Sequence, residues 1–419
     1  NLTPLFIKTT TMFVRASYKS RSPSGLHSTI RGTLFSSRLV GLLPLSGLRH
    51  PTSDQLRFTL RTPYTIIYAA SMSGQTLMFL ITLHWLIKNG ISFSNVTNVM
   101  FYTSSFVSSL ILVNIGHFWP RFIVSVEAVE GRLPPFTRDV ARMSNVTMVF
   151  ILFAALIEHS LSIWYRLTVA YSYDPDNLLE TFCQFYMPWI FNYTSYALWK
   201  GLLSEMFSLQ STFIWTYNDV LIMVISIYLT EHFLINHDLL KNAVKQDNFS
   251  CNEIRIQYLK IVRLVKLING QFGIYILTSF GSNLYWICTQ LFYSLKLVFF
   301  ILMYHKSNTV LHKHPCHVSL HGVEHTIYFT YSFSFLMVRT LLVLLLAARI
   351  HSTSVAPLYT LYEVPSSKFD VDVERFIAQI KNVKVAMSGL DLFYVTRNMI
   401  LTLLGTIVTY ELVLLQFNK

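Results

Sequence analysis

Seven apolar runs, each long enough to cross a bilayer, limit what this chain can fold into. A helix rises about 1.5 Å per residue, so about 20 apolar residues cross the ~30 Å hydrocarbon layer. Only 13% of the 419 residues are charged and 53% are hydrophobic, unlike the balance of a soluble domain. The runs predict an all-α, polytopic membrane protein with seven spans at about 64–87, 98–119, 146–165, 196–228, 272–304, 326–348 and 399–417.

The placement of Lys and Arg predicts the orientation of these spans. With the N-terminus inside, 25 of the 33 basic residues fall in the cytoplasmic segments 1–62, 121–142, 236–269 and 349–397. Basic residues collect on the cytoplasmic side of membrane proteins, so we expect a cytoplasmic N-terminus and an extracellular C-terminus. The Ser- and Arg-rich segment 1–62 also has the composition of a transit peptide. A cytoplasmic segment is the favoured interpretation, and the net charge of +12 then implies no nucleic-acid partner.

Two of the runs are too long for a bilayer and should either tilt or continue into the cytoplasm. We therefore expect a six-helix bundle over residues 63–350, with cytoplasmic extensions at about 229–271. Residues 237–270 and 371–392 alternate apolar and basic residues at helical spacing. Such amphipathic helices either lie on the inner leaflet or join a cytoplasmic helical bundle. The second reading makes 351–397 a cytoplasmic anchor helix that leads into the last span, 398–419.

The last span carries a stripe of small and polar residues that lipid would not require. Its members recur in steps of three and four, so they share one helix face: Asn398, Thr402, Gly405, Thr409, Leu412 and Gln416. The stripe either lines a pore between subunits or packs against helices of its own chain. In a pore, Gln416 and the adjacent Phe417 would form a gate at the outer mouth. Glu411 points away from the stripe, and Lys296 is its candidate partner.

A second group of polar and aromatic residues lies in the outer halves of spans three to six. Intramembrane ionisable groups are costly unless they are paired or solvated, so they often mark cavities. Carboxylates and amides suit sugar hydroxyls, and aromatic faces suit the C–H face of a sugar ring. The candidate ligand-binding residues are Glu158, His159, Trp199, Glu205, Trp286, Gln290, Tyr293, His325 and Tyr328. For each one alone, an interhelical hydrogen bond explains it equally well, and Trp215 and Asp219 are assigned to inner packing.

The segments expected outside the membrane carry further candidate features. Asn95 and Asn192 begin glycosylation triplets on the extracellular side. Cys183 and Cys316 also fall outside, where a disulfide is sterically conceivable. Six histidines lie in 305–325; an exposed loop is favoured over a metal site there, so no metal or cofactor is expected. Phosphate-loop, GxSxG and HExxH motifs are missing, which argues against an enzyme.

The end of the chain resembles a known family. Thr409-Tyr410, five residues and then Gln416-Phe417 match the TY-x5-QF signature that closes insect gustatory receptors. The string from Ser388-Gly389 through 395–397 to 405–412 is most similar to their sugar-receptor branch. The resemblance implies a sugar-gated, non-selective cation channel in the plasma membrane of chemosensory neurons. It also implies a homotetramer, or a hetero-oligomer with related receptors, with the last helix at its centre and an anchor domain below the membrane.

Two other functions fit the same sequence. One is a gustatory receptor for another tastant, such as fructose or a bitter compound. The other is a secondary transporter or a G-protein-signalling receptor that uses the same cavity. The predicted orientation is the reverse of a G-protein-coupled receptor, and no internal repeat suggests a transporter built from duplicated halves.

Overall fold

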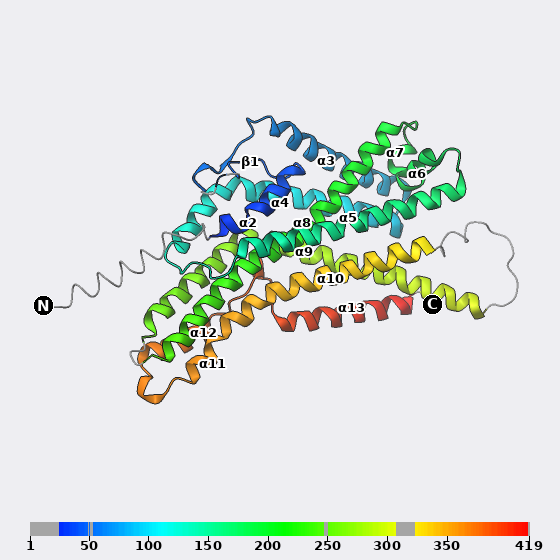
Figure 1. Ribbon diagram of the computed structural model, residues 1–419. Coiled ribbons are helices and arrows are strands. Elements are labelled where there is room, and N and C mark those ends of the chain that lie inside the picture. Colours follow the sequence, from blue (N-terminus) through cyan, green and yellow to red (C-terminus); the bar gives the residue numbers. More distant parts are fainter. Residues whose placement is uncertain (1–24, 49, 51–52, 247–249, 307–322, 418–419) are drawn as a thin grey trace.

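The computed structural model is an elongated bundle of long helices that cross one another (Figure 1). It describes residues 25–48, 50, 53–246, 250–306 and 323–417. Within the helices, the side chains of 296–306, 404, 411–412 and 414–417 lie outside the described part. Six described helices are long and apolar enough to cross a membrane: α3 (Tyr64–Asn89), α4 (Phe93–Glu130), α5 (Val140–Tyr173), α8 (Leu198–Val244), α9 (Asn252–Lys306) and α10 (Val323–Val355). A further helix, α13 (Arg397–Phe417), stands where the seventh span is predicted.

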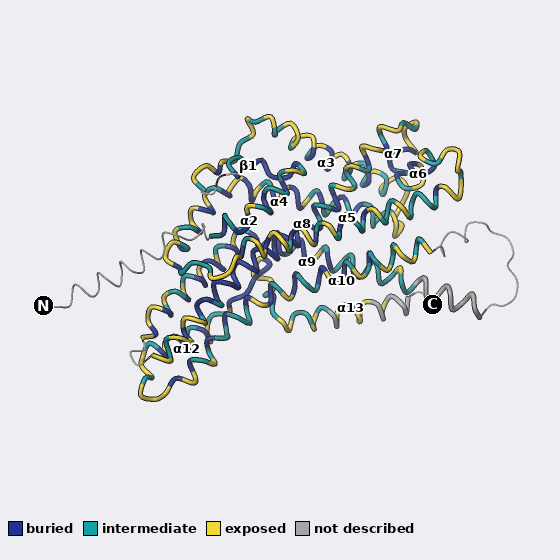
Figure 2. Tube along the Cα trace, viewed as in Figure 1, coloured by how far each residue is buried: buried dark blue, intermediate teal, exposed yellow. Residues whose placement is uncertain are grey.

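Helix α8 is the centre of the bundle. Every residue from 216 to 233 of this helix is buried, whichever face it occupies. A helix that is apolar all round is buried on all sides, and α8 packs against α2, α3, α4, α5, α9 and α10. Figure 2 shows this buried stretch running through the middle of the molecule. At Gly74, α3 approaches α8 so closely that an added Cβ would stand 2.0 Å from the Phe207 ring.

The long helices continue past the membrane bundle into a second bundle at one end of the molecule (Figure 1). Helices α8 and α9 have 47 and 55 residues, and they meet the short helices α11 (Pro357–Tyr362) and α12 (Val371–Asn382) there. Tyr258 of α9 packs edge-on against Phe376 of α12, with ring centroids 5.2 Å apart. A short 3-10 turn, η4 (Ser366–Lys368), precedes α12. That this bundle is cytoplasmic remains a prediction.

The amphipathic helix predicted over 371–392 is shorter than expected. Helix α12 ends at Asn382, and Val383 has extended backbone angles. The next residues form a hairpin in which β3 (Ser388–Gly389) pairs antiparallel with β4 (Phe393–Tyr394). Leu390 and Asp391 turn the hairpin with positive φ angles of 55° and 57°. The alternation Val383-Lys384-Val385 fits an extended chain as well as a helix, which explains the error.

The described part of the predicted cytoplasmic segment 1–62 is folded against the helix bundle. Helix α2 (Leu26–Leu39) packs against α4, α5 and α8, and burial of Leu26, Ile30 and Leu34 holds it there. Its first backbone N–H, that of Leu26, donates to Glu130 Oε1 over 2.6 Å. A carboxylate at this end complements the helix dipole. The chain then forms β1 (Leu45–Ser46), η2 (Ser53–Gln55) and β2 (Arg57–Phe58), with β1 and β2 antiparallel.

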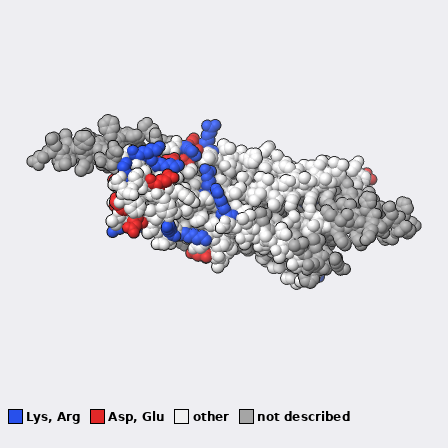
Figure 3. Space-filling model, turned by 90° about the horizontal axis from the view of Figure 1, so that it is seen from below, with Lys and Arg blue, Asp and Glu red and all other residues white. Residues whose placement is uncertain are grey.

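Charged side chains are unevenly spread along the molecule. On the face shown in Figure 3, Lys and Arg gather towards the end that holds α11 and α12, and the other half of that face is almost free of charge. At the opposite end, the short helices α6 (Leu178–Tyr186) and α7 (Pro188–Phe191) fold over the tops of α3, α5 and α8. Which of the two ends faces the cytoplasm stays a prediction.

Candidate ligand cavity

A polar and aromatic cavity of about 280 Å³ lies in the half of the bundle that α6 and α7 cover. That volume is at the lower end of the roughly 300–1,000 Å³ of small-molecule sites. Helices α4, α5, α6, α8, α9 and α10 all contribute side chains to it. Its lining is Thr97, Asn98, Phe101, Tyr102, Glu158, His159, Ser162, Arg166, Tyr186, Met187, Trp189, Glu205, Ser208, Thr212, Trp215, Trp286, Gln290, Tyr328 and Ser332.

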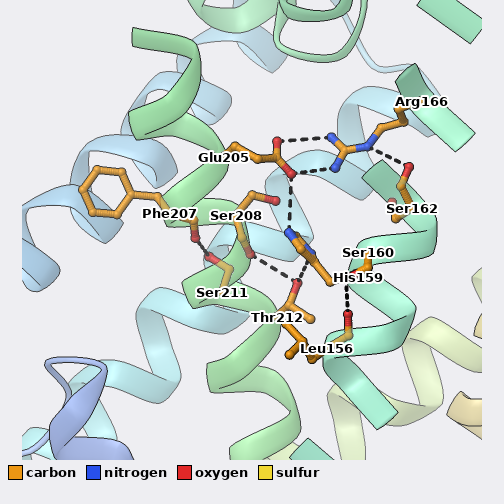
Figure 4. Close-up of polar contacts among 10 residues, drawn as sticks. All are labelled: Leu156, His159, Ser160, Ser162, Arg166, Glu205, Phe207, Ser208, Ser211 and Thr212. Carbon is orange, nitrogen blue, oxygen red and sulfur yellow. Dashed lines mark hydrogen bonds and ion pairs between the residues drawn. The ribbon is translucent and has the colours of Figure 1, made fainter. Parts of the chain in front are cut away.

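A charged cluster forms one wall of the cavity, between α5 and α8 (Figure 4). Arg166 holds the Glu205 carboxylate with both terminal nitrogens, at 2.7 Å and 3.4 Å. His159 Nε2 lies 3.4 Å from the same carboxylate, and its Nδ1 lies 3.3 Å from the Thr212 hydroxyl. The residues His159, Ser162 and Arg166 follow one another at helical spacing, so α5 presents them on one face. The bidentate geometry fixes the Glu205 carboxylate in place.

A second set of hydrogen bonds crosses from α5 to α9 through α10. Ser332 donates to Glu158 Oε1 over 2.8 Å, and Gln290 Nε2 donates to Ser332 over 3.1 Å. Within the described part of the chain, Gln290 Oε1 has no hydrogen-bond donor, and neither Trp189 Nε1 nor Trp215 Nε1 has an acceptor. Buried polar groups are normally paired, so three unpaired atoms on residues of one cavity lining make this cavity the candidate site for a polar ligand.

Aromatic rings close the inner side of the cavity. Trp215 and Trp286 have ring centroids 5.4 Å apart, and Phe101 packs edge-on against Trp286 at 6.1 Å. Directly behind Trp215 lies the guanidinium of Arg339, 4.0 Å from the ring centroid. Arg339 Nε also lies 3.0 Å from Asp219 Oδ2, and both side chains are fully buried. The aromatic floor therefore stands on a buried ion pair.

Six of the nine residues predicted to bind ligand line this one cavity. They come from four helices and are Glu158, His159, Glu205, Trp286, Gln290 and Tyr328. The other three lie elsewhere. Trp199 is 65% exposed on the outside of α8. Tyr293 packs against Phe93, with ring centroids 5.1 Å apart, and His325 against Tyr165 at 5.2 Å.

Several lining residues escaped the sequence-based prediction. Arg166 was not among the residues predicted to bind ligand, although its spacing from His159 places both on one face of α5. Trp215 was assigned to inner packing, and it forms part of the floor. Met187 and Trp189 come from the segment of α6 and α7, whose return over the bundle leaves no periodic signal in the sequence. Asp219 does lie deeper in the core, as predicted.

Comparison with known proteins identifies the family. A family model described as trehalose receptor matches residues 8–305 and 316–419. The chain belongs to the trehalose receptor family. The gustatory receptor for sugar taste 64f of Drosophila melanogaster is 28% identical over 95% of this chain and 82% of its own length. The gustatory receptor 5a for trehalose of the same fly is 29% identical over 94% of this chain and 85% of its own length. The resemblance found at the end of the sequence is thereby confirmed.

Solved structures show the fold of this trehalose receptor family member. The insect olfactory receptor OR5 from Machilis hrabei matches it with a TM-score of 0.63 and 14% identity, over 92% of this chain and 97% of OR5. The complex of OR5 with eugenol gives a TM-score of 0.61 at 15% identity, with the same coverage. The chain is therefore a multi-pass helical membrane protein that shares its fold with an insect olfactory receptor.

In this family member, the predicted pore stripe on α13 faces away from the rest of the chain. Asn398, Thr402, Gly405 and Thr409 are all exposed, and no atom of another element lies within 4 Å of an added Cβ at Gly405. The opposite side of α13 packs on α9 and α10, where Ile407 is buried. Among the described residues, the stripe does not pack against helices of its own chain. The side chains of Glu411, Leu412, Gln416 and Phe417, and of Lys296, lie outside the described residues.

The remaining predictions concern the outer end. Asn192 is exposed after α7, and Asn95 is half-buried in the first turn of α4, where Trp85 Nε1 donates to its Oδ1 over 3.1 Å. Glycosylation of both stays a prediction. Cys183 is buried next to Gly201. Cys316 and the histidines of 307–322 lie outside the described residues, so the disulfide and the histidine-rich loop stay predictions as well.

Proposed function

We propose that this chain is a taste receptor that opens a non-selective cation pore when a sugar binds, and that it works as a tetramer. The observation that carries the proposal is that the cavity and the exposed stripe of α13 share two helices. Helices α9 and α10 supply Trp286, Gln290, Tyr328 and Ser332 to the cavity. The same two helices hold α13. A ligand that moves α9 or α10 therefore has a direct mechanical route to the stripe.

The cavity wall suits a sugar. The fixed carboxylate of Glu205 accepts hydrogen bonds from vicinal hydroxyls, and Gln290 Oε1 and Trp215 Nε1 offer an acceptor and a donor that no described residue satisfies. The rings of Trp215 and Trp286 provide apolar faces for the C–H groups of a sugar ring. Family membership supports the same ligand class, since one relative is named for trehalose and another for sugar taste.

Gating follows from a difference in affinity. A sugar shifts the closed–open equilibrium only to the extent that it binds the open state more tightly. We propose that the contacts to α9 and α10 tighten on opening and pull α13 outward from a central axis. The stripe then lines the widened path, because its described members are exposed and face no helix of their own chain.

Calcium imaging of cells that express the receptor tests this proposal. A panel of mono- and disaccharides is applied to the native chain, to Gln290→Leu and to the control Thr278→Val. The control removes from the same helix a half-buried hydroxyl that donates to the Ile274 carbonyl and lies outside the cavity lining. Gln290→Leu removes one hydrogen bond to the sugar, worth about 0.5–1.5 kcal/mol, and leaves a sugar hydroxyl unpaired. The half-maximal sugar concentration should therefore rise about tenfold in Gln290→Leu and stay unchanged in the control.

Three outcomes would contradict the proposal. If every sugar is inert and a bitter or apolar compound evokes calcium entry, the receptor serves another tastant. If sugar is accumulated without current, the chain is a transporter. If Gln290→Leu responds like the native chain at equal surface expression, the cavity is not the sugar site.

A further inference from the structure

A second and larger hollow lies on the membrane-facing side of the bundle. Its volume is about 710 Å³, and α3, α5 and α8 form its walls, with the end of α2 at its base. Leu39 and Val40 close the base. Thr212 lines both this groove and the ligand cavity. The groove therefore adjoins the ligand cavity and is separate from it.

The walls of the groove are apolar and unusually exposed. Ile66, Met206 and Leu156 are 75%, 53% and 50% exposed. Soluble proteins rarely leave such patches uncovered. Here the three walls belong to helices long and apolar enough to span a membrane, so lipid is the surrounding medium.

The few polar groups in the groove are already satisfied by the protein. Gln210 Nε2 donates to Val40 O over 2.7 Å and to the Ser71 hydroxyl, and Gln210 Oε1 accepts from Gln75 Nε2 over 2.9 Å. An occupant therefore needs no hydrogen-bonding groups along the groove. A hydrocarbon chain meets that condition, whereas a sugar does not.

Basic residues stand at the base of the groove. Arg38 precedes Leu39, and its guanidinium lies 4.8 Å from the Tyr64 ring centroid. Arg61 is exposed just before the start of α3. In the described part of the chain, no carboxylate lies within ion-pair distance of either guanidinium. The predicted orientation places this end at the inner leaflet.

We propose that the groove binds one anionic phospholipid of the inner leaflet. Its acyl chain fills the space between α3, α5 and α8, and its headgroup phosphate meets Arg38 and Arg61. The groove is apolar along its length and has basic residues at one end, which matches the acyl chain and the anionic headgroup of such a lipid. A phosphate near two guanidinium groups accepts charge-assisted hydrogen bonds from them.

Photolabelling of the purified full chain tests the site. The receptor is placed in phosphatidylcholine nanodiscs that contain phosphatidylserine with a photoreactive acyl chain, and labelled peptides are mapped by mass spectrometry. Labelling should concentrate on the α3, α5 and α8 residues of the groove. Ala70→Trp, which fills the groove, should lose most of this labelling. The control Ala69→Trp, on the exposed neighbouring position of α3, should keep it.

A charge variant tests the headgroup separately. Arg38→Gln/Arg61→Gln should weaken labelling by phosphatidylserine roughly tenfold, and labelling by a photoreactive phosphatidylcholine less, because its choline cation cancels the charge of the phosphate. Even labelling of all lipid-facing helices, or equal labelling in Ala70→Trp and Ala69→Trp, would overturn the site. Equal labelling by the two phospholipids in the native chain, or occupation by a sterol probe that excludes phospholipid, would overturn the anionic occupant. Native elution on size exclusion is required of each variant.

Discussion

The ion pair beneath the cavity predicts a large stability cost for Arg339→Met. Arg339 and Asp219 are both fully buried, with Nε and Oδ2 3.0 Å apart. Removing one partner of a buried pair costs about 3–5 kcal/mol, because the remaining charge stays desolvated and unpaired. Asp219 would keep its hydrogen bonds from Ser279 and from Asn283, the latter at 2.9 Å and 3.0 Å. We therefore expect about 3 kcal/mol, at the lower end of that range.

Thermal unfolding in nanodiscs at one fixed scan rate measures this cost. A loss of about 3 kcal/mol should lower the Tm by roughly 3 °C in a chain of this size. The double variant Asp219→Asn/Arg339→Met should recover part of the loss, with a coupling of about 1–3 kcal/mol. The control Val338→Met alters a lipid-exposed neighbour on α10 and should leave the Tm unchanged.

Two results would refute this reasoning. One is an Arg339→Met variant whose Tm lies within about 1 °C of the native Tm, well short of the expected decrease. The other is a double variant whose loss equals the sum of the two single losses. Either would mean that Asp219 does not depend on Arg339 for its burial.

Three further predictions follow from the cavity, the last helix and the N-terminal helix. The Lys side chain in Arg166→Lys has one nitrogen and cannot hold Glu205 at two points, so in calcium imaging it should raise the half-maximal sugar concentration about tenfold. An unchanged dose response would show that the two-point contact between Arg166 and Glu205 is not needed for sugar binding. Gly405→Phe should abolish sugar-evoked current at normal surface expression, while Thr406→Phe, one helix position away, should conduct; equal currents would remove Gly405 from the pore. Burial in α2 lowers the pKa of His27, so as the pH falls the unfolded chain binds a proton at this histidine before the folded chain does. The stability of the folded chain should therefore fall as the pH drops below about 6.5, the usual histidine pKa. In His27→Gln the Tm should depend less on pH over that window, and an identical pH profile would contradict the assignment.

The spans were predictable because lipid imposes a length and a composition on any helix that crosses it. Six of the seven predicted runs coincide with described helices that are long and apolar enough to cross a membrane, and the seventh coincides with α13, whose role as a span stays a prediction. Helix α2 was missed because Ser, Thr and Arg dominate its composition, although Leu26, Ile30 and Leu34 recur every four residues. Its partners lie more than 100 residues away in α5 and α8, and single-sequence patterns do not show such contacts.

The candidate site was predictable only in part, because depth along a helix does not fix direction. Trp199 lies six residues before Glu205, about 9 Å along α8 and about 240° around it, so it points away from the cavity. Tyr293 and His325 lie on suitable faces about one turn beyond the cavity, where they pack on Phe93 and Tyr165.

Current through a planar bilayer that contains only the purified chain tests whether the receptor itself is the sugar-gated channel. We expect discrete cation currents when a sugar is added, with no nucleotide or G protein present, and a rightward shift of the dose response in Gln290→Leu. Silence under a panel of sugars and voltages, from protein that elutes as a folded tetramer, would contradict it.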